Sequence, residues 1–237
     1  MKIFVIGDLH LSNHMEVDKP MDIFGIEWLD HTARLKNNWN EIIDDDDYVL
    51  IAGDISWGLT LNEARADLDW INGLKGKKLL FKGNHDPWWQ STNKLNLIYQ
   101  DESLTFMQNH AFIIEKDGEK IGITGTRGWI CPGTEGFSEH DRKVYNREVL
   151  RLEMSLKEAK QMGADRIITI FHFPPTNDKH QQSGFTELLE KYNVEKAFYG
   201  HLHGKDVWPK GLKGVLNGIS YDLVSLDYLK GIPKEIV

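Results

Sequence analysis

The sequence KLLFKGNHD, residues 78–86, decides how the rest of the chain is interpreted. Its apolar start is typical of a buried strand, and Gly83 then allows the backbone to turn sharply. Asn84, His85 and Asp86 follow without a spacer, so an amide oxygen, an imidazole and a carboxylate lie directly after the end of one strand. The motif alone also fits an ordinary turn, because Gly, Asn and Asp favour turns. Its chemistry therefore depends on partners elsewhere in the chain.

The composition is that of a globular protein with an acidic balance. The 237 residues are 41% hydrophobic and 27% charged, with a formal net charge of −8. This charge opposes a general attraction to polyanions, so nucleic acid is an unfavoured partner, although a local basic patch is not excluded. No apolar run approaches the roughly 20 residues of a membrane span, so no membrane partner is expected. The sequence does not indicate an oligomeric state.

The cellular compartment follows from two further features. The first residues turn acidic too soon for a signal peptide, and they are typical of a strand instead. The single cysteine, Cys131, excludes an internal disulfide framework and a cysteine zinc site. We therefore expect a cytoplasmic protein in a reducing environment.

Predicted strands and helices alternate at both ends of the chain. We expect strands at residues 2–6, 48–52, 77–81, 104–106, 111–114, 120–124, 166–171, 195–199, 207–208, 214–216 and 221–226. We expect helices at residues 27–43, 61–74, 90–99, 141–162 and 185–192. No repeat or linker interrupts the pattern, so we expect one mixed α/β domain over residues 1–237.

Polar side chains follow five of these predicted strands. Ligands bind at the carboxyl ends of the strands in open α/β sheets, so we expect these side chains to gather. The set consists of Asp8, His10, Asp54, Asn84, His85, Asp86, His172, His201 and His203. Carboxylate, imidazole and amide donors without a thiolate suit Mn, Fe, Co or Zn. There are too many donors for one ion, so the set suits two cations. With a bridging hydroxide, two such cations would keep a net positive charge that attracts an anionic substrate.

Five ordered blocks of this set resemble the calcineurin-like metallophosphoesterases. The blocks are Asp8-x-His10, Gly53-Asp54, Gly83-Asn84-His85-Asp86, His172 and Gly200-His201-x-His203. The resemblance spans residues 8–203. It implies a four-layer αββα sandwich with a dinuclear centre of divalent or mixed-valence ions, Mn and Fe first, with Zn or Co as alternatives.

The resemblance also implies a role for each residue of the set. It implies that one ion is held by Asp8, His10 and His203, that the other is held by Asn84, His172 and His201, and that Asp54 bridges them. His85 would bind the phosphoryl group and assist the leaving oxygen, and Asp86 would orient His85. Lys82 and Asp86 stand where the protein Ser/Thr phosphatases of this superfamily carry Arg and Glu, which argues against that subgroup.

Several residues near these blocks have alternative interpretations. Arg127 lies in a Gly-rich break, where its guanidinium either holds phosphate bidentately or forms a structural ion pair. For the tryptophans beside the blocks we favour packing over lining a substrate pocket; these are Trp57, Trp88 and Trp89. We expect Cys131 to be inert. The histidines outside the blocks are expected on the surface or in loops: His14, His31, His110, His140 and His180.

The sequence therefore predicts a metal-dependent phosphoesterase with a small phosphorylated substrate, either a monoester or a diester. A nuclease would use the same core and is an alternative. A metal-stabilised scaffold that binds partners without turnover is a rival from a different class.

Overall fold

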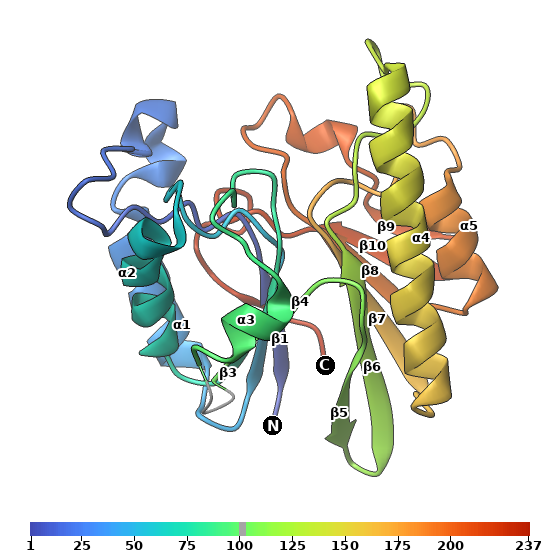
Figure 1. Ribbon diagram of the computed structural model, residues 1–237, viewed down its shortest axis with the longest axis horizontal. Coiled ribbons are helices and arrows are strands. Elements are labelled where there is room, and N and C mark those ends of the chain that lie inside the picture. Colours follow the sequence, from blue (N-terminus) through green and yellow to red (C-terminus); the bar gives the residue numbers. More distant parts are fainter. Residues whose placement is uncertain (100–102) are drawn as a thin grey trace. The chain divides into compact units, whose positions relative to one another are not determined.

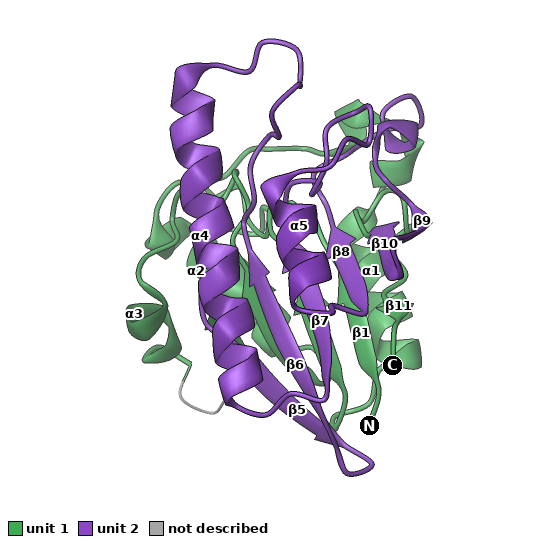
Figure 2. Ribbon diagram, turned by 90° about the vertical axis from the view of Figure 1, so that its right-hand side faces the viewer, with its two compact units in different colours: residues 1–106, 224–237 green, residues 107–223 purple. Residues whose placement is uncertain are grey.

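The computed structural model describes residues 1–99 and 103–237, and the chain divides into two compact units (Figure 1, Figure 2). Unit 1 comprises residues 1–106 and 224–237, and unit 2 comprises residues 107–223. Each unit contains one sheet with strands of both directions and its own helices. The predicted mixed α/β class is confirmed, whereas the single domain over all residues stays a prediction.

The sheet of unit 1 is built on three parallel strands. Its order is β11-β1-β2-β3-β4, and β11 runs antiparallel to β1. The strands are β1 (Ile3–Ile6), β2 (Tyr48–Ile51), β3 (Lys77–Phe81), β4 (Leu104–Met107) and β11 (Lys234–Glu235). Strand β1 is buried along its whole length, which is typical of parallel strands and explains its uninterrupted apolar sequence.

The helices of unit 1 bury one apolar face against this sheet. They are α1 (His31–Ile42), α2 (Leu61–Asn72) and α3 (Thr92–Asn96). Leu35 and Trp39 of α1 and Leu68 of α2 belong to one hydrophobic core with Phe4 and Val49 of the sheet. Helix α1 begins later than predicted, because two short 3-10 helices, Asp22–Phe24 and Ile26–Trp28, occupy the residues before it.

The sheet of unit 2 has six strands, with antiparallel strands at both edges. Its order is β5-β6-β7-β8-β10-β9, and the four inner strands are parallel. The strands are β5 (Phe112–Lys116), β6 (Glu119–Thr126), β7 (Arg166–Phe171), β8 (Lys196–Tyr199), β9 (Gly214–Leu216) and β10 (Ile219–Leu223). The carboxyl ends of β6, β7 and β8 therefore meet at one edge of this sheet.

Two helices, α4 (Glu139–Gln161) and α5 (Gly184–Lys191), lie side by side on one face of the unit 2 sheet (Figure 2). Both begin with a capping box, in which the side chain of Ser138 or Ser183 accepts from the backbone three residues later. Within the part of the chain that the structure describes, no helix combines the length and the apolar character needed to cross a membrane.

Two short elements differ from the prediction. Residues 207–208 were expected as a strand, but Trp208 begins a 3-10 helix, Trp208–Lys210. Pro209 gives the reason, because proline has no N–H to donate to a strand partner. The sequence prediction also missed β11, which has only two residues and is defined by its pairing with β1.

Lys78 is a buried cation whose removal is expected to destabilise unit 1. It is 1% exposed, and its Nζ donates to the carbonyls of Asn72, Leu74 and Gly76 at 3.3, 2.7 and 2.8 Å. These carbonyls lie between the end of α2 and the start of β3. Lys78→Met leaves them without this donor, so the free energy of unfolding should fall by about 2–3 kcal/mol in chemical denaturation.

The neighbouring Lys77 provides the matched control. Lys77 is exposed, and its Nζ lies over the ring of Tyr48 at 5.4 Å from the centroid. Lys77→Met should therefore cost less than about 1 kcal/mol. Equal losses for the two variants would show that the three carbonyl contacts of Lys78 contribute nothing specific.

Candidate functional site

The loops after β1 and β2 are joined by backbone hydrogen bonds beyond the ends of the strands. The N–H of Asp8 donates to the Gly53 carbonyl at 2.9 Å, and the N–H of His10 donates to the Asp54 carbonyl at 3.0 Å. The parallel pairing of the two strands thus continues into the loops. As a result, His10 Nε2 lies 3.8 Å from Asp54 Oδ2, and the side chains of Asp8, His10 and Asp54 are all buried.

The backbone is strained where the candidate ligands stand. Four of the seven predicted metal ligands adopt a left-handed conformation, with φ of 58° at Asp8, 46° at His10, 49° at Asp54 and 70° at His201. Only a few per cent of non-glycine residues do so, although Asp and His are enriched among them. Such strain persists where the surrounding structure holds it, and it concentrates at functional sites.

The turn after β3 is fastened by the carboxylate of Asp86. Asp86 is fully buried, and it accepts from the N–H groups of Gly83, Ile55 and Ser56 at 2.8, 2.9 and 3.3 Å, and from Trp88 Nε1 at 3.1 Å. Burial first, and then the nearby carboxylate of Asp54, raise the pKa of Asp86 to about 7. These hydrogen bonds tie the turn to the loop after β2, and the predicted orientation of His85 by Asp86 stays a prediction.

His85 stands on this turn and is exposed. Its backbone N–H donates to Asp54 Oδ1 at 2.8 Å, which fixes the turn relative to that carboxylate. The His85 ring lies 4.6 Å from the ring of Trp57 and 5.8 Å from the ring of His10. Asn84, between Gly83 and His85, is half-buried. An exposed imidazole beside buried donors is suited to meet a substrate rather than to hold an ion.

The three tryptophans near the blocks have different surroundings. Trp88 and Trp89 are buried and pack against Phe106 in the core of unit 1, which confirms packing for these two. Trp57 is only half-buried and stacks on the His10 ring, with centroids 4.7 Å apart and planes at 23°. Trp57 therefore packs against a candidate ligand as well as against the core.

Unit 2 brings three further candidate ligands to one edge of its sheet. His172 follows β7, and His201 and His203 follow β8. The N–H of His172 donates to the Arg127 carbonyl and the N–H of Gly200 donates to the His172 carbonyl, both at 3.1 Å, so the loops after β6, β7 and β8 are linked. The rings of His172 and His201 lie 5.1 Å apart at 75°.

Arg127 forms a structural ion pair, which is one of the two roles that the sequence allowed for it. One of its Nη atoms lies 3.8 Å from a carboxylate oxygen of Glu148, a residue that is 1% exposed. The guanidinium also lies over the ring of Trp129, 4.7 Å from its centroid. Glu148 accepts from Thr126 Oγ1 at 2.6 Å and from Arg151 at 2.8 Å. A structural role is therefore observed, and a phosphate contact by Arg127 stays a prediction.

One histidine outside the blocks differs from the expectation. His140 and His180 are exposed, and His14 and His110 are half-buried in loops. In contrast, His31 is buried in the first turn of α1 with its ring against Trp28. Burial is also the main cause that lowers the pKa of His31. The signal was present in the sequence, because His31 stands four residues before Leu35 and therefore on the buried face of the helix.

Cys131 has the surroundings expected for an unreactive thiol. It is 2% exposed, and burial raises the pKa of its thiol to about 12. A thiol in that state is protonated at neutral pH and is a poor nucleophile. The expectation that Cys131 is inert is consistent with this environment.

The donor chemistry of the described residues fits divalent metal ions. Candidate metal-ligand groups draw on Asp8, His10 and Asp54 of unit 1, and on His172, His201 and His203 of unit 2. Carboxylates and imidazoles without a thiolate suit Mn, Fe, Co or Zn. Buried carboxylates are costly unless cations compensate them, which is a second reason why this set suits metal ions.

Comparison with known proteins identifies a family and several proteins that are similar to this chain. The family profile of the calcineurin-like phosphoesterases matches residues 1–205. An uncharacterised protein of Methanocaldococcus jannaschii is 32% identical over 174 residues, which cover 71% of this chain and 90% of that protein. The Gene 66 protein of Mycobacterium phage L5 is 40% identical over 82 residues, which cover 34% of this chain and 37% of the phage protein.

The fold also resembles a solved structure. A protein of unknown function from Aquifex aeolicus aligns over 99% of this chain and 95% of its own, with a TM-score of 0.53 and 17% identity. At that identity the likeness concerns the fold alone.

Gly83 allows the close approach of the turn to Asp54, and a side chain there is expected to disturb the candidate ligand. A Cβ on Gly83 would collide with the Asp54 backbone nitrogen and Oδ1, and would lie 2.8 Å from its Cγ. We expect Gly83→Ala to weaken metal binding about tenfold or more, because the ligand must move. Calorimetric titration with Mn²⁺ measures the change, and circular dichroism checks the fold.

Gly73 supplies the control for this substitution. It has φ of −73°, and its added Cβ would meet nothing closer than 3.6 Å. Gly73→Ala should bind Mn²⁺ as the native chain does. Unchanged affinity in a folded Gly83→Ala variant would mean that Asp54 is not a ligand.

Proposed function

We propose that this chain, which belongs to the calcineurin-like phosphoesterase family, is a metal-dependent hydrolase that cleaves a small phosphomonoester or phosphodiester. The observation that carries the proposal is the strained backbone at four candidate ligands, which are contributed by three separate loops. Strain of this kind concentrates at functional sites, and ligation of metal ions would compensate it at these residues. The acidic balance of the chain favours a small substrate over nucleic acid.

The proposed ligand assignment follows the order of the family's motif blocks along the chain. One ion would be held by Asp8, His10 and His203, the other by Asn84, His172 and His201, and Asp54 would bridge them. When bound, the ions would supply Lewis acidity and lower the pKa of a water molecule. Mn and Fe are the first candidates, and Zn or Co are the alternatives. The cytoplasm is the proposed compartment.

The protein's own groups would position the substrate. The exposed imidazole of His85 would donate a hydrogen bond to a phosphoryl oxygen and protonate the leaving oxygen. The carboxylate of Asp86, which accepts three backbone N–H groups, would hold the turn that carries His85. In this role Asp86 positions the turn. The stacking of Trp57 on His10 would restrict water on that side of the loop.

Removal of the His85 imidazole tests the proposed catalysis. We expect His85→Ala to lower kcat about 10²–10⁴-fold on p-nitrophenyl phosphate or bis-p-nitrophenyl phosphate with Mn²⁺, because general acid catalysis is lost. The bound metal should be unchanged, which elemental analysis measures. His140→Ala, at an exposed histidine of α4, should retain full activity. If the native chain were inactive on a broad panel of esters, the scaffold alternative would replace the enzyme.

Neutralising Asp54 tests its place between the two ions. Asp54→Asn keeps an oxygen for the N–H of His85 but loses the negative charge. We expect both ions to bind more weakly, about 10–100-fold, because one bridging carboxylate serves both. Asp46→Asn, at an exposed acid after α1, is the control and should bind both ions normally. Retention of both ions at native affinity by Asp54→Asn would remove the bridging role.

A further inference from the structure

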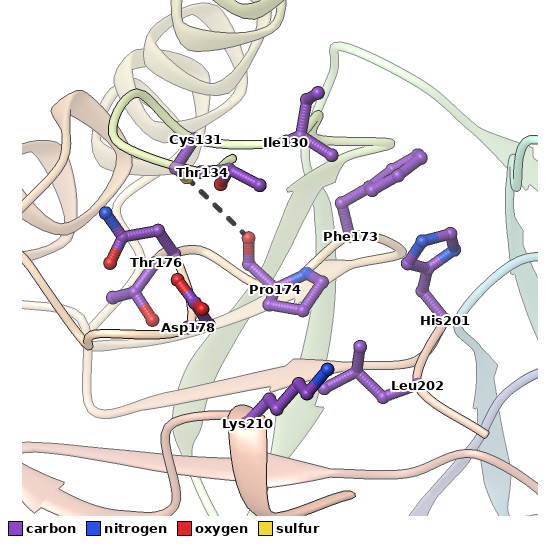
Figure 3. Close-up of a pocket in the computed structure, with 11 residues that line it drawn as sticks. Ile130, Cys131, Thr134, Phe173, Pro174, Thr176, Asp178, His201, Leu202 and Lys210 are labelled. Atoms are coloured by element: carbon purple, nitrogen blue, oxygen red, sulfur yellow. Dashed lines mark hydrogen bonds between the residues drawn. The ribbon is translucent and has the colours of Figure 1, made fainter. Parts of the chain in front are cut away.

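Unit 2 contains a cavity of about 150 Å³ beside the candidate ligand His201 (Figure 3). Its walls come from the loop after β6, the loop after β7, and the segment that follows β8. An apolar cavity of about this volume accommodates one benzene ring. The space therefore suits a single ring.

The interior of the cavity is mostly apolar. Ile130, Phe173, Pro174 and Leu202 line it from different directions (Figure 3). Cys131 also lines it, and its Sγ makes a weak hydrogen bond to the Pro174 carbonyl at 3.9 Å. This apolar lining favours the binding of an apolar group, because burial of apolar surface lowers the free energy. It offers no nucleophile, because the thiol is protonated.

The cavity is connected to the candidate metal ligand through Phe173. The rings of Phe173 and His201 lie 4.0 Å apart at 37°, and Phe173 also contacts the ring of Trp129 at 5.0 Å. A ring seated against Phe173 therefore lies next to His201. The exposed residues Lys210 and Asp178 also line the cavity, so its charged groups are at the solvent side.

We propose that this cavity binds the leaving group of the ester, and that the leaving group is a single aromatic or heteroaromatic ring. The inference rests on the proposed function, because it names the substrate class of the same site. The ring would fill the space between Ile130 and Phe173. The phosphoryl group would remain on the side of His201.

Filling the cavity tests this assignment. Thr134 is a half-buried residue of the lining, and Thr134→Phe places a phenyl ring in the cavity. The activity of this variant is measured on a phenyl ester and on a methyl ester of phosphate. Both are monoesters or both are diesters, according to which class the native chain hydrolyses. We expect kcat/KM for the phenyl ester to fall about tenfold or more, with the methyl ester unchanged. Glu135→Phe, on the same loop but outside the lining, should change neither. Equal losses for both esters would overturn the proposal.

A binding measurement separates the cavity from the enzyme activity. In ligand-observed NMR, phenol should bind the metal-loaded native chain and the Glu135→Phe variant, but not a folded Thr134→Phe variant. Phenol binding without hydrolysis of any ester would remove the proposed function and keep a ring-binding cavity. Hydrolysis of both esters with no phenol binding would keep the function and overturn the cavity assignment.

Discussion

The structure of unit 1 around its candidate ligands depends on one buried carboxylate. Asp86 accepts backbone hydrogen bonds from Gly83 on its own turn and from Ile55 and Ser56 on the loop after β2. Since that second loop is hydrogen-bonded to the loop after β1, a single side chain stabilises the end of three parallel strands. Without it, the N–H groups of two loops would be buried without acceptors, and that cost would release Asp54 from the turn.

The buried carboxylates in the loops after β1, β2 and β3 are electrostatically unfavourable without a bound cation. Three carboxylates, Asp8, Asp54 and Asp86, are buried after three neighbouring strands, and the raised pKa of Asp86 reflects both burial and repulsion by Asp54. Divalent cations would reverse this cost, because they replace lost hydration with direct coordination. The left-handed backbone at Asp8, His10 and Asp54 adds to the same cost.

Much of the fold and the ligand set could be predicted from the sequence, because both follow from strong local patterns. The strands Lys77–Phe81 and Arg166–Phe171 match their predicted bounds, since apolar runs end there at turn residues. What could not be predicted depends on tertiary contacts, such as the pairing of β11 with β1 and the ion pair of Arg127 with Glu148. The cavity beside His201 also had no sequence signal, because its lining comes from three loops.

The pairing of β11 with β1 has a consequence for synthesis on the ribosome. Unit 2 is one uninterrupted stretch, residues 107–223, so all of its strands emerge in succession and can associate at once. Unit 1 instead needs residues 224–237, which are translated after all of unit 2: the Val224 carbonyl accepts from the N–H of Gly7, and β11 pairs with β1. One edge of β1 therefore stays unpaired while more than half of the chain is synthesised. We expect chaperones that bind exposed strand edges to bind this chain early in its synthesis.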